Sequence, residues 1–287
     1  MNKVFDFLDR HRAPDELRAE AYEQAGPQLR GLLKQNIAAQ HRLAEQRMPC
    51  AARTTEIIYG SEACARASRP APWCLILHEA GYPAAPRALA AATPAILTGV
   101  ENIWVASLHD KHNVVMPAPQ LLAAWELAGV ENTAVTLDKE ILPLLLEVLN
   151  SESFDLRHGP GRILVLGSPV WDKILCAALA DETRALLRRE GRAPHILLTG
   201  DDCLARQDAL RALHPDAELF ADAHFASLSK LDVFYNAVFF NSRDRGRALS
   251  IPASLHLDYG QAATWVWPEL PGSFFLNHGT AFYSLSD

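Results

Sequence analysis

The stretch from Trp73 to Arg162 decides the fold of this chain. It opens on an apolar run, Trp73-Cys-Leu-Ile-Leu-His78, and an alanine-rich segment with helical spacing follows at 84–97. The alternation repeats, with strand-like runs at 102–108 and 133–137 and helix-like segments at 119–128 and 139–149. Short apolar strands that alternate with helices are typical of βαβ units on a parallel sheet. The stretch closes on Phe154-Asp-Leu-Arg-His-Gly-Pro-Gly-Arg162.

A second α/β unit follows this stretch, and helices precede it. Helices are expected up to about residue 48, with a short strand at 55–59. After residue 160 the pattern predicts strands at 162–166, 195–199, 218–221, 233–241 and 254–258, helices at 168–189 and 203–213, and strand-like runs at 264–267 and 273–276. We therefore expect two Rossmann-like, incomplete doubly wound domains. The first, nucleotide-binding-like, spans 73–160, and the second is discontinuous and combines 1–72 with 161–287.

The composition excludes several classes of protein. The chain has 287 residues, of which 49% are hydrophobic, which is enough for real cores. The net charge of −7 argues against nucleic acid as a partner, because duplex binding needs a concentrated basic surface. No apolar run approaches the roughly 20 residues of a membrane span, so we expect no membrane partner. Five cysteines without a Cys-x-x-Cys pair indicate free thiols in a reducing, cytoplasmic compartment.

The order of several motifs resembles that of the histidinol dehydrogenase family, within the wider aldehyde-dehydrogenase-like superfamily. The similar segments are Tyr82-Pro83 with 93–100, Leu122-Ala-Ala-Trp-Glu-Leu-Ala-Gly-Val130, the stretch at 154–162, Ala253-Ser-Leu-His-Leu-Asp-Tyr259 and Asn277-His-Gly-Thr-Ala-Phe-Tyr-Ser284. The resemblance implies an aldehyde-dehydrogenase-like fold and a homodimer. It also implies an NAD-dependent, zinc-assisted oxidation of an amino alcohol to an acid. The family's zinc ligands have no counterpart here, so we expect no zinc.

The family match also suggests a proton-transfer residue. The family's Glu-His pair supplies acid/base catalysis, and the same positions are Leu255 and His256 in this chain. Histidine titrates near neutrality, whereas leucine carries no proton to transfer. In an alternating strand His256 and Asp258 share a face, so the aspartate is a candidate orienting partner. The alternative is a structural histidine whose hydrogen bonds are satisfied within the fold.

The same match places the candidate binding residues. Asn277 and His278 would contact the substrate, and Gly81, Gly159, Gly161 and Arg162 would contact NAD or NADP. Arginine pairs with phosphate or carboxylate groups, and glycines allow close approach of a backbone. The alternative is a tight turn with Arg162 in solvent. The chain has no G-x-G-x-x-G fingerprint that would predict a dinucleotide independently.

Three hypotheses for function follow. The first, which we prefer, is a zinc-independent NAD(P)-linked oxidoreductase that acts on a small alcohol, aldehyde or acyl substrate. The second is a catalytically inactive relative that binds an anionic metabolite or nucleotide, held by Arg162 and a helix beginning at Ser168. The third is a scaffold subunit in a biosynthetic assembly, with its apolar aromatic tail as the interface.

Overall fold

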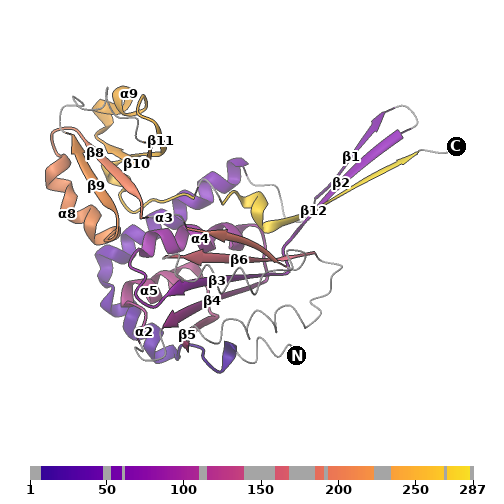
Figure 1. The fold of residues 1–287 in the computed structure, drawn as a ribbon, viewed down its shortest axis with the longest axis horizontal. Coiled ribbons are helices and arrows are strands. Elements are labelled where there is room, and N and C mark those ends of the chain that lie inside the picture. Colours follow the sequence, from indigo (N-terminus) through magenta and orange to yellow (C-terminus); the bar gives the residue numbers. More distant parts are fainter. Residues whose placement is uncertain are drawn as a thin grey trace.

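The computed structural model describes residues 8–47, 53–59, 62–109, 115–138, 159–167, 185–190, 193–222, 234–267 and 270–284. Within these ranges the chain forms two parallel sheets and one antiparallel three-stranded arm that projects from the body (Figure 1). The predicted α/β class with two parallel sheets is confirmed. The predicted helix at 139–149 and the helix start at Ser168 lie outside the described residues.

The first sheet has five parallel strands in the order β5-β4-β3-β6-β7. Their bounds are β3 Trp73–Glu79, β4 Asn102–His109, β5 Thr133–Asp138, β6 Gly161–Leu166 and β7 Ala185–Arg189. In β3, β4 and β6 nearly every residue is buried, as continuous apolar runs in a parallel sheet require. The predicted domain division at residue 160 falls between β5 and β6, which belong to this one sheet.

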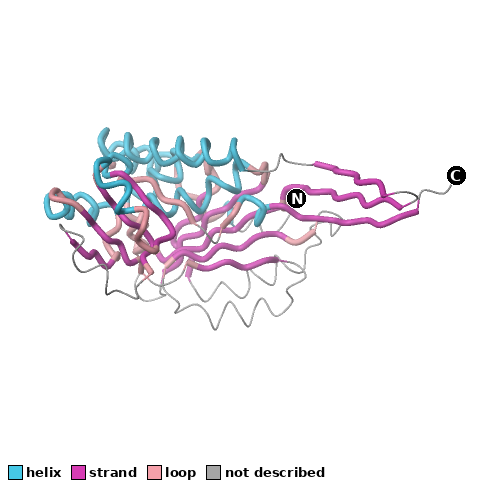
Figure 2. The backbone as a smooth tube through the Cα atoms, turned by 90° about the horizontal axis from the view of Figure 1, so that it is seen from above, coloured by secondary structure: helices cyan, strands magenta, loops and turns pink. Residues whose placement is uncertain are grey.

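Four helices cover one face of this sheet in two layers (Figure 2). They are α2 Asp15–Gln24, α3 Gly26–Arg47, α4 Ala85–Leu97 and α5 Pro119–Ala128. The helices α4 and α5 share the main core with β3, β4 and β6, because alanine-rich α4 can approach the strands closely. The N-terminal helices pack on top of them: Leu33 of α3 contacts the cluster of Leu89 and Ala124. The predicted N-terminal helices are confirmed.

The second sheet has four parallel strands in the order β11-β10-β8-β9. Its strands are β8 His195–Thr199, β9 Glu218–Asp222, β10 Tyr235–Phe240 and β11 Ala253–Asp258, with helices α8 Cys203–Leu213 and α9 Arg245–Ala248. One face shares a core cluster with Ala90 of α4, which joins the two units. The other face carries a separate cluster that includes Val238 and Ala248 of α9.

The arm combines segments that lie far apart in the sequence. Strands β1 Arg53–Tyr59 and β2 Glu62–Pro70 form a hairpin, and β12 Leu276–Ser284 pairs antiparallel with β2. The predicted strand at 55–59 is confirmed. No helix within the described ranges combines the length and the apolar character that a bilayer span requires.

Three predicted elements were wrong. Residues 185–189 form the edge strand β7 and not the end of a helix, because their backbone pairs with β6. Residues 264–267 form no regular strand, since Trp265 packs its ring against His214 and Trp267 in a connecting segment. The run at 273–276 is mostly the 3-10 turn η7 Gly272–Phe275, and the strand begins only at Leu276.

Candidate site at the carboxyl ends of the first sheet

The order of the first sheet creates a topological switch point between β3 and β6. From β3 the chain proceeds to β4 and β5 on one side, and β6 and β7 lie on the other side. In open α/β sheets, ligands bind outside the carboxyl ends of the strands at such a point. The candidate site therefore consists of the turns that follow β3 and β6 and the residues around them.

The turn after β3 is open to solvent. Tyr82 N–H donates to Glu79 O at 2.9 Å, and Ala80 N–H donates to Leu108 O at 2.8 Å, which fixes the turn against β4. Between them Gly81 is exposed, and a Cβ built on it would meet nothing within 4 Å. The backbone of this turn is therefore accessible to a ligand.

The turn after β6 is held by a buried carboxylate. Gly167 adopts a φ of +94°, which favours glycine, and its N–H donates to Glu190 Oε2 at 2.8 Å. Tyr82 donates its hydroxyl hydrogen to Glu190 Oε1 at 3.0 Å. Glu190 directly follows β7, so its carboxylate connects the carboxyl ends of β3, β6 and β7.

The charge of Glu190 is compensated by Arg87 of α4. The Nη1 atom of Arg87 lies 3.0 Å from Glu190 Oε1, and the two side chains are 1% and 4% exposed. Arg87 Nη2 contacts both carboxylate oxygens of Asp216, at 2.5 and 2.6 Å, in the connection between α8 and β9. Burial raises the pKa of Glu190, and Arg87 opposes that rise. This ion network joins the first unit to the second.

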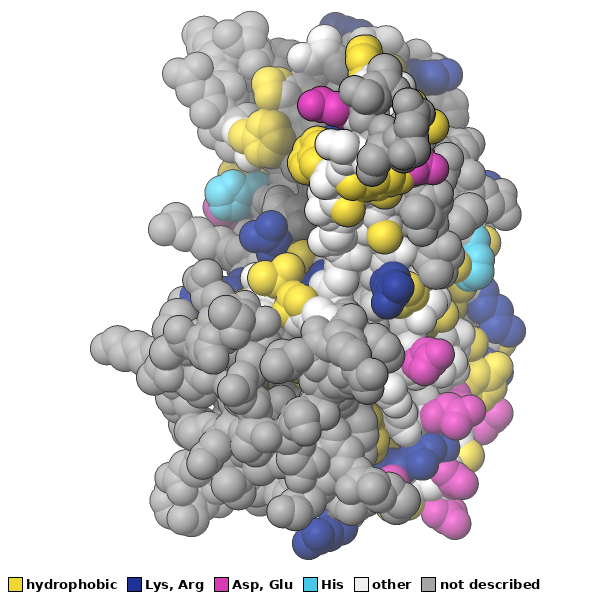
Figure 3. Space-filling model, turned by 90° about the vertical axis from the view of Figure 1, so that its right-hand side faces the viewer, with side chains coloured by type: hydrophobic (Ala, Val, Ile, Leu, Met, Phe, Trp, Pro, Cys, Tyr) yellow, Lys and Arg dark blue, Asp and Glu magenta, His cyan; other side chains and the backbone are white. Residues whose placement is uncertain are grey.

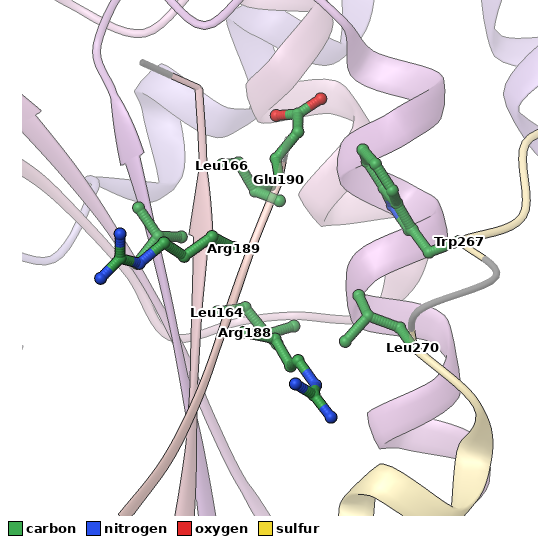
Figure 4. A pocket seen from close by; sticks show the side chains of 8 residues that line it. Leu164, Leu166, Arg188, Arg189, Glu190, Trp267 and Leu270 are labelled. Carbon is green, nitrogen blue, oxygen red and sulfur yellow. The ribbon is translucent and has the colours of Figure 1, made fainter. Parts of the chain in front are cut away.

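A small pocket lies beside Glu190. It is lined by Leu164, Val165, Leu166, Arg188, Arg189, Glu190, Trp267 and Leu270. Figure 4 shows Glu190 and Leu166 at one end and the Trp267 ring across the gap. Trp267 Nε1 donates to the carbonyl of Arg87 at 2.9 Å, which anchors this wall to α4. Its enclosed volume of about 10 Å3 is close to the least that holds one water molecule, so the pocket is a small hollow and not a preformed ligand site.

The structure places His256 and Asp258 away from this pocket. Both lie on β11 and share one face, as the alternation predicts. Their register partners on β10, Val238 and Phe240, belong to the cluster beneath α9, on the face that points away from α4. His256 Nε2 is hydrogen-bonded to Ile251 O at 3.0 Å.

Asp258 is engaged locally. Its carboxylate accepts from Ser242 Oγ at 2.5 Å and from Gly260 N–H, and the Ser242 hydrogen bond lowers the pKa of the carboxyl. The catalytic roles of His256 and Asp258 stay predictions, and they would require a site other than the pocket beside Glu190.

Four predicted binding residues come together at the amino end of β6. Arg162 is 1% exposed, and its guanidinium donates to the carbonyls of Pro160, Gly161, Phe274 and Leu276 and to Asn277 Oδ1. The alternative of Arg162 in solvent is therefore wrong. Burial lowers the pKa of Arg162 to about 10. Since its donors point at internal acceptors, Arg162 joins β6 to the arm.

The glycines and the neighbouring tail residues complete this cluster. A Cβ on Gly161 would lie 2.1 Å from the Trp73 ring, and one on Gly159 would lie 2.8 Å from Asn277 Cγ. These glycines therefore allow close approach of side chains of this chain itself. His278 lies on β12 beside Ser68 of the arm. The binding roles predicted for Gly159, Gly161, Arg162, Asn277 and His278 are untested, and only Gly81 lies at the switch point.

Sequence reasoning missed Glu190, Arg87 and Asp216. A lone arginine inside an alanine-rich apolar helix was the available signal, because a buried cation needs a partner. Nothing in the sequence identifies that partner, since Glu190 and Asp216 lie more than a hundred residues further along. The residues just before Glu190 were also predicted to be helical, whereas they form the edge strand β7.

Two buried histidines predict a pH dependence of stability. Burial lowers the pKa of His78 to about 4 and that of His214 to about 3, so both are neutral in the folded chain. Between pH 6.5 and about 4 the unfolded chain binds protons that the folded chain does not. We expect each histidine to lower the free energy of unfolding by up to about 1.4 kcal/mol per pH unit as the pH falls.

Urea unfolding between pH 7 and pH 4 measures this dependence. The pKa of Glu190 is raised in the folded chain, so just above its ordinary pKa the folded chain holds a proton that the unfolded chain does not. In that range Glu190 raises the free energy of unfolding as the pH falls, which is opposite to the effect of the histidines. The comparison is therefore between the wild type and His78→Asn, whose slope should be smaller by the share of one histidine. Identical slopes in the two proteins would contradict the assignment.

Comparison with known proteins supports the fold. No protein-family model and no curated protein matches the chain. Among solved structures, histidinol dehydrogenase from Elizabethkingia anophelis is similar, with a TM-score of 0.55, 11% identity, and coverage of 98% of this chain and 80% of that one. An NAD-dependent benzaldehyde dehydrogenase from Corynebacterium glutamicum gives a TM-score of 0.52, 11% identity and coverage of 98% and 83%. The chain therefore has the aldehyde-dehydrogenase-like fold.

Proposed function

We propose that this chain is an NAD(P)-linked oxidoreductase that acts on a small alcohol, aldehyde or acyl substrate. The observation that carries the proposal is the strand order of the first sheet. Taken in chain order from β3, it reads 3-2-1-4-5, which matches five strands of the dinucleotide-binding order 3-2-1-4-5-6. Two proteins with the same fold, one of them named as NAD-dependent, support it.

The residues at the switch point are compatible with a dinucleotide. The bare turn at Gly81 offers backbone with no side chain in front of it, and Glu190 fixes the adjacent turn at Gly167. When bound, the nicotinamide would accept or donate a hydride. The chain would position it at the carboxyl ends of β3 and β6, next to the hollow beside Glu190. In this arrangement Glu190 is a positioning residue: it holds Tyr82 and the turn at Gly167 in place.

Zinc chemistry is no part of this proposal. Within the described ranges, no group of three histidine, cysteine, aspartate or glutamate side chains is arranged to hold a metal ion. A catalytic zinc site needs about three such ligands with fixed geometry. The described residues therefore do not fit the zinc that the family resemblance implies.

Calorimetric titration with NAD and NADP tests the proposal. We expect Gly81→Leu to weaken binding of the preferred dinucleotide at least tenfold, because a side chain there would cover the turn. Its melting temperature should stay close to that of the wild type, since the position is open. Gly31→Leu, at an equally open position on α3, is the matched control and should bind normally.

Other outcomes separate the alternatives. A folded chain that binds neither dinucleotide would overturn the oxidoreductase proposal. The anion-binding alternative would then remain, although the guanidinium of Arg162 is already hydrogen-bonded within the chain. The scaffold alternative placed its interface on the aromatic tail. In the structure Trp265 and Phe275 are buried, and Trp267 and Phe274 pack on core clusters.

We further propose a homodimer in which the arm forms the interface. Large apolar side chains are exposed on it, namely Ile57, Ile58, Tyr59, Phe282 and Tyr283. Figure 3, which views the molecule from the side of the arm, shows hydrophobic side chains on this face. Ile57 and Phe282 both pair with Cys64, so they share one face, while Ile58 and Tyr283 share the other through Ala63. Apolar surface of this kind indicates an interaction site.

Sedimentation velocity over a range of protein concentrations tests the dimer. We expect Phe282→Asp, at a position that is 82% exposed, to raise the dimer dissociation constant at least tenfold, because it introduces a charge into the apolar arm. Leu204→Asp is the matched control: it changes an apolar residue that is 68% exposed on α8, away from the arm. A monomeric wild type would overturn the proposal.

A further inference from the structure

Near the carboxyl ends of β3 and β4, three buried side chains carry polar atoms for which the described part of the chain supplies no hydrogen-bond partner. The atoms are His78 Nε2, Ser107 Oγ and Trp125 Nε1. Their residues are at most 1% exposed. Buried polar atoms are normally hydrogen-bonded, to protein or to ordered water, because leaving one unsatisfied costs about 1–3 kcal/mol. Three such residues in one region therefore need an explanation.

The three side chains lie on the same face of the first sheet. His78 and Ser107 are register partners on β3 and β4, so their side chains leave the sheet side by side. Trp125 of α5 covers that face and stacks on His78, with ring centroids 6.0 Å apart and planes inclined by 29°. The three side chains therefore neighbour one another between the ends of two strands and one helix.

The hydrogen bond at the other ring nitrogen fixes the chemistry of the cluster. His78 Nδ1 lies 2.7 Å from the carbonyl oxygen of Glu79. A carbonyl can only accept, so Nδ1 carries the hydrogen in the neutral ring, and Nε2 presents a lone pair. Trp125 Nε1 is a donor only, and the Ser107 hydroxyl can donate or accept. The cluster thus offers one acceptor, one donor and one group that can serve as either.

We propose that His78 Nε2, Ser107 Oγ and Trp125 Nε1 bind one internal water molecule. Water has the donors and acceptors that match this set, and a buried water typically makes about three hydrogen bonds. It would donate to Nε2, accept from Nε1 and exchange a hydrogen bond with the serine. The site lies directly beneath the turn at 79–82, whose Glu79 carbonyl is held by the same imidazole ring. This inference is independent of any dinucleotide.

A crystal structure of the full chain that resolves ordered water tests the site. In the wild type we expect a single isolated density peak within about 3.2 Å of His78 Nε2 and Ser107 Oγ. A cluster without a peak would overturn the proposal. So would a direct hydrogen bond from Ser107 to His78 that leaves no room for water.

Two variants make the test specific. Ser107→Val replaces the hydroxyl by a methyl group and adds a second methyl group, so the peak should disappear. Thr133→Val makes the same kind of change on neighbouring β5, where the hydroxyl already has a partner in Val130 O, and it should keep the peak. A peak that persists in Ser107→Val would show that the serine is no ligand and overturn the site as proposed. The wild-type structure decides the main point even where a variant fails to fold.

Discussion

Replacing Arg87 with methionine should lower the free energy of unfolding by about 3–5 kcal/mol, the range found when one partner of a buried ion pair is removed. Arg87 is the counter-charge of Glu190, and both are almost fully buried. Without it the Glu190 carboxylate would be desolvated beside no cation, and Asp216 would lose both of its contacts with α4. The two units would also lose an ionic contact between them.

Chemical denaturation of the wild type and the variant measures this loss. Arg243→Met is the matched control, because Arg243 forms a comparable 2.6 Å pair with Asp201 in which both side chains are more than 60% exposed. Exposed pairs contribute about 0–1 kcal/mol, so this control should unfold nearly as the wild type does. Equal losses of unfolding free energy in the two variants would contradict the claim that the buried pairs of Arg87 stabilise the fold more than an exposed pair does.

Arg162→Met should be the second strongly destabilising change, with a loss of about 3 kcal/mol or more. The guanidinium donates to the carbonyls of Phe274 and Leu276 and to Asn277, all at the entry to β12. Each buried acceptor that loses its partner costs about 1–3 kcal/mol. The start of β12 would lose its link to β6, so we expect easier proteolysis within the arm as well.

Arg188→Met provides the control for Arg162. Both guanidinium groups lie over the Phe274 ring, at 5.3 and 5.5 Å, but Arg188 is exposed. The control should therefore lose well under 1 kcal/mol, because exposed cation–π contacts contribute about 0.5–1 kcal/mol at most. If Arg162→Met unfolded at the same denaturant concentration as Arg188→Met, the internal hydrogen bonds would not be what makes Arg162 important.

Much of the fold could be predicted from the sequence because its main strands and helices have distinct patterns. The apolar runs of β3 and β4 are too short for helices, and α4 between them is rich in alanine and free of β-branched runs. The edge strand and the segments near the end of the chain were harder to predict from the sequence. Strand β7 carries arginines on a sheet edge, where exposed charge is tolerated and the strand period is hidden.

The candidate site was less predictable for physical reasons. Family matching identified residues by their neighbours in the sequence, whereas the network of Arg87, Glu190 and Asp216 is assembled from three separate elements. Glycine illustrates the ambiguity. The motif predicts that Gly161 binds a ligand, yet in the structure the Trp73 ring occupies the space that a side chain at Gly161 would need. Gly81, in contrast, faces open space, which only the folded turn reveals.

The pairing of β12 with β2 has a consequence for folding during synthesis. The hairpin of β1 and β2 leaves the ribosome about 200 residues before the strand that completes the arm. Throughout that time one edge of β2 has free N–H and C=O groups, and such edges template aggregation. Glu62, Arg66 and Arg69 lie along β2. Charged residues on an unpaired strand edge disfavour pairing with other nascent chains. Polar substitution of these residues should thus reduce the yield of folded chain in cells more than it reduces the stability of the finished protein.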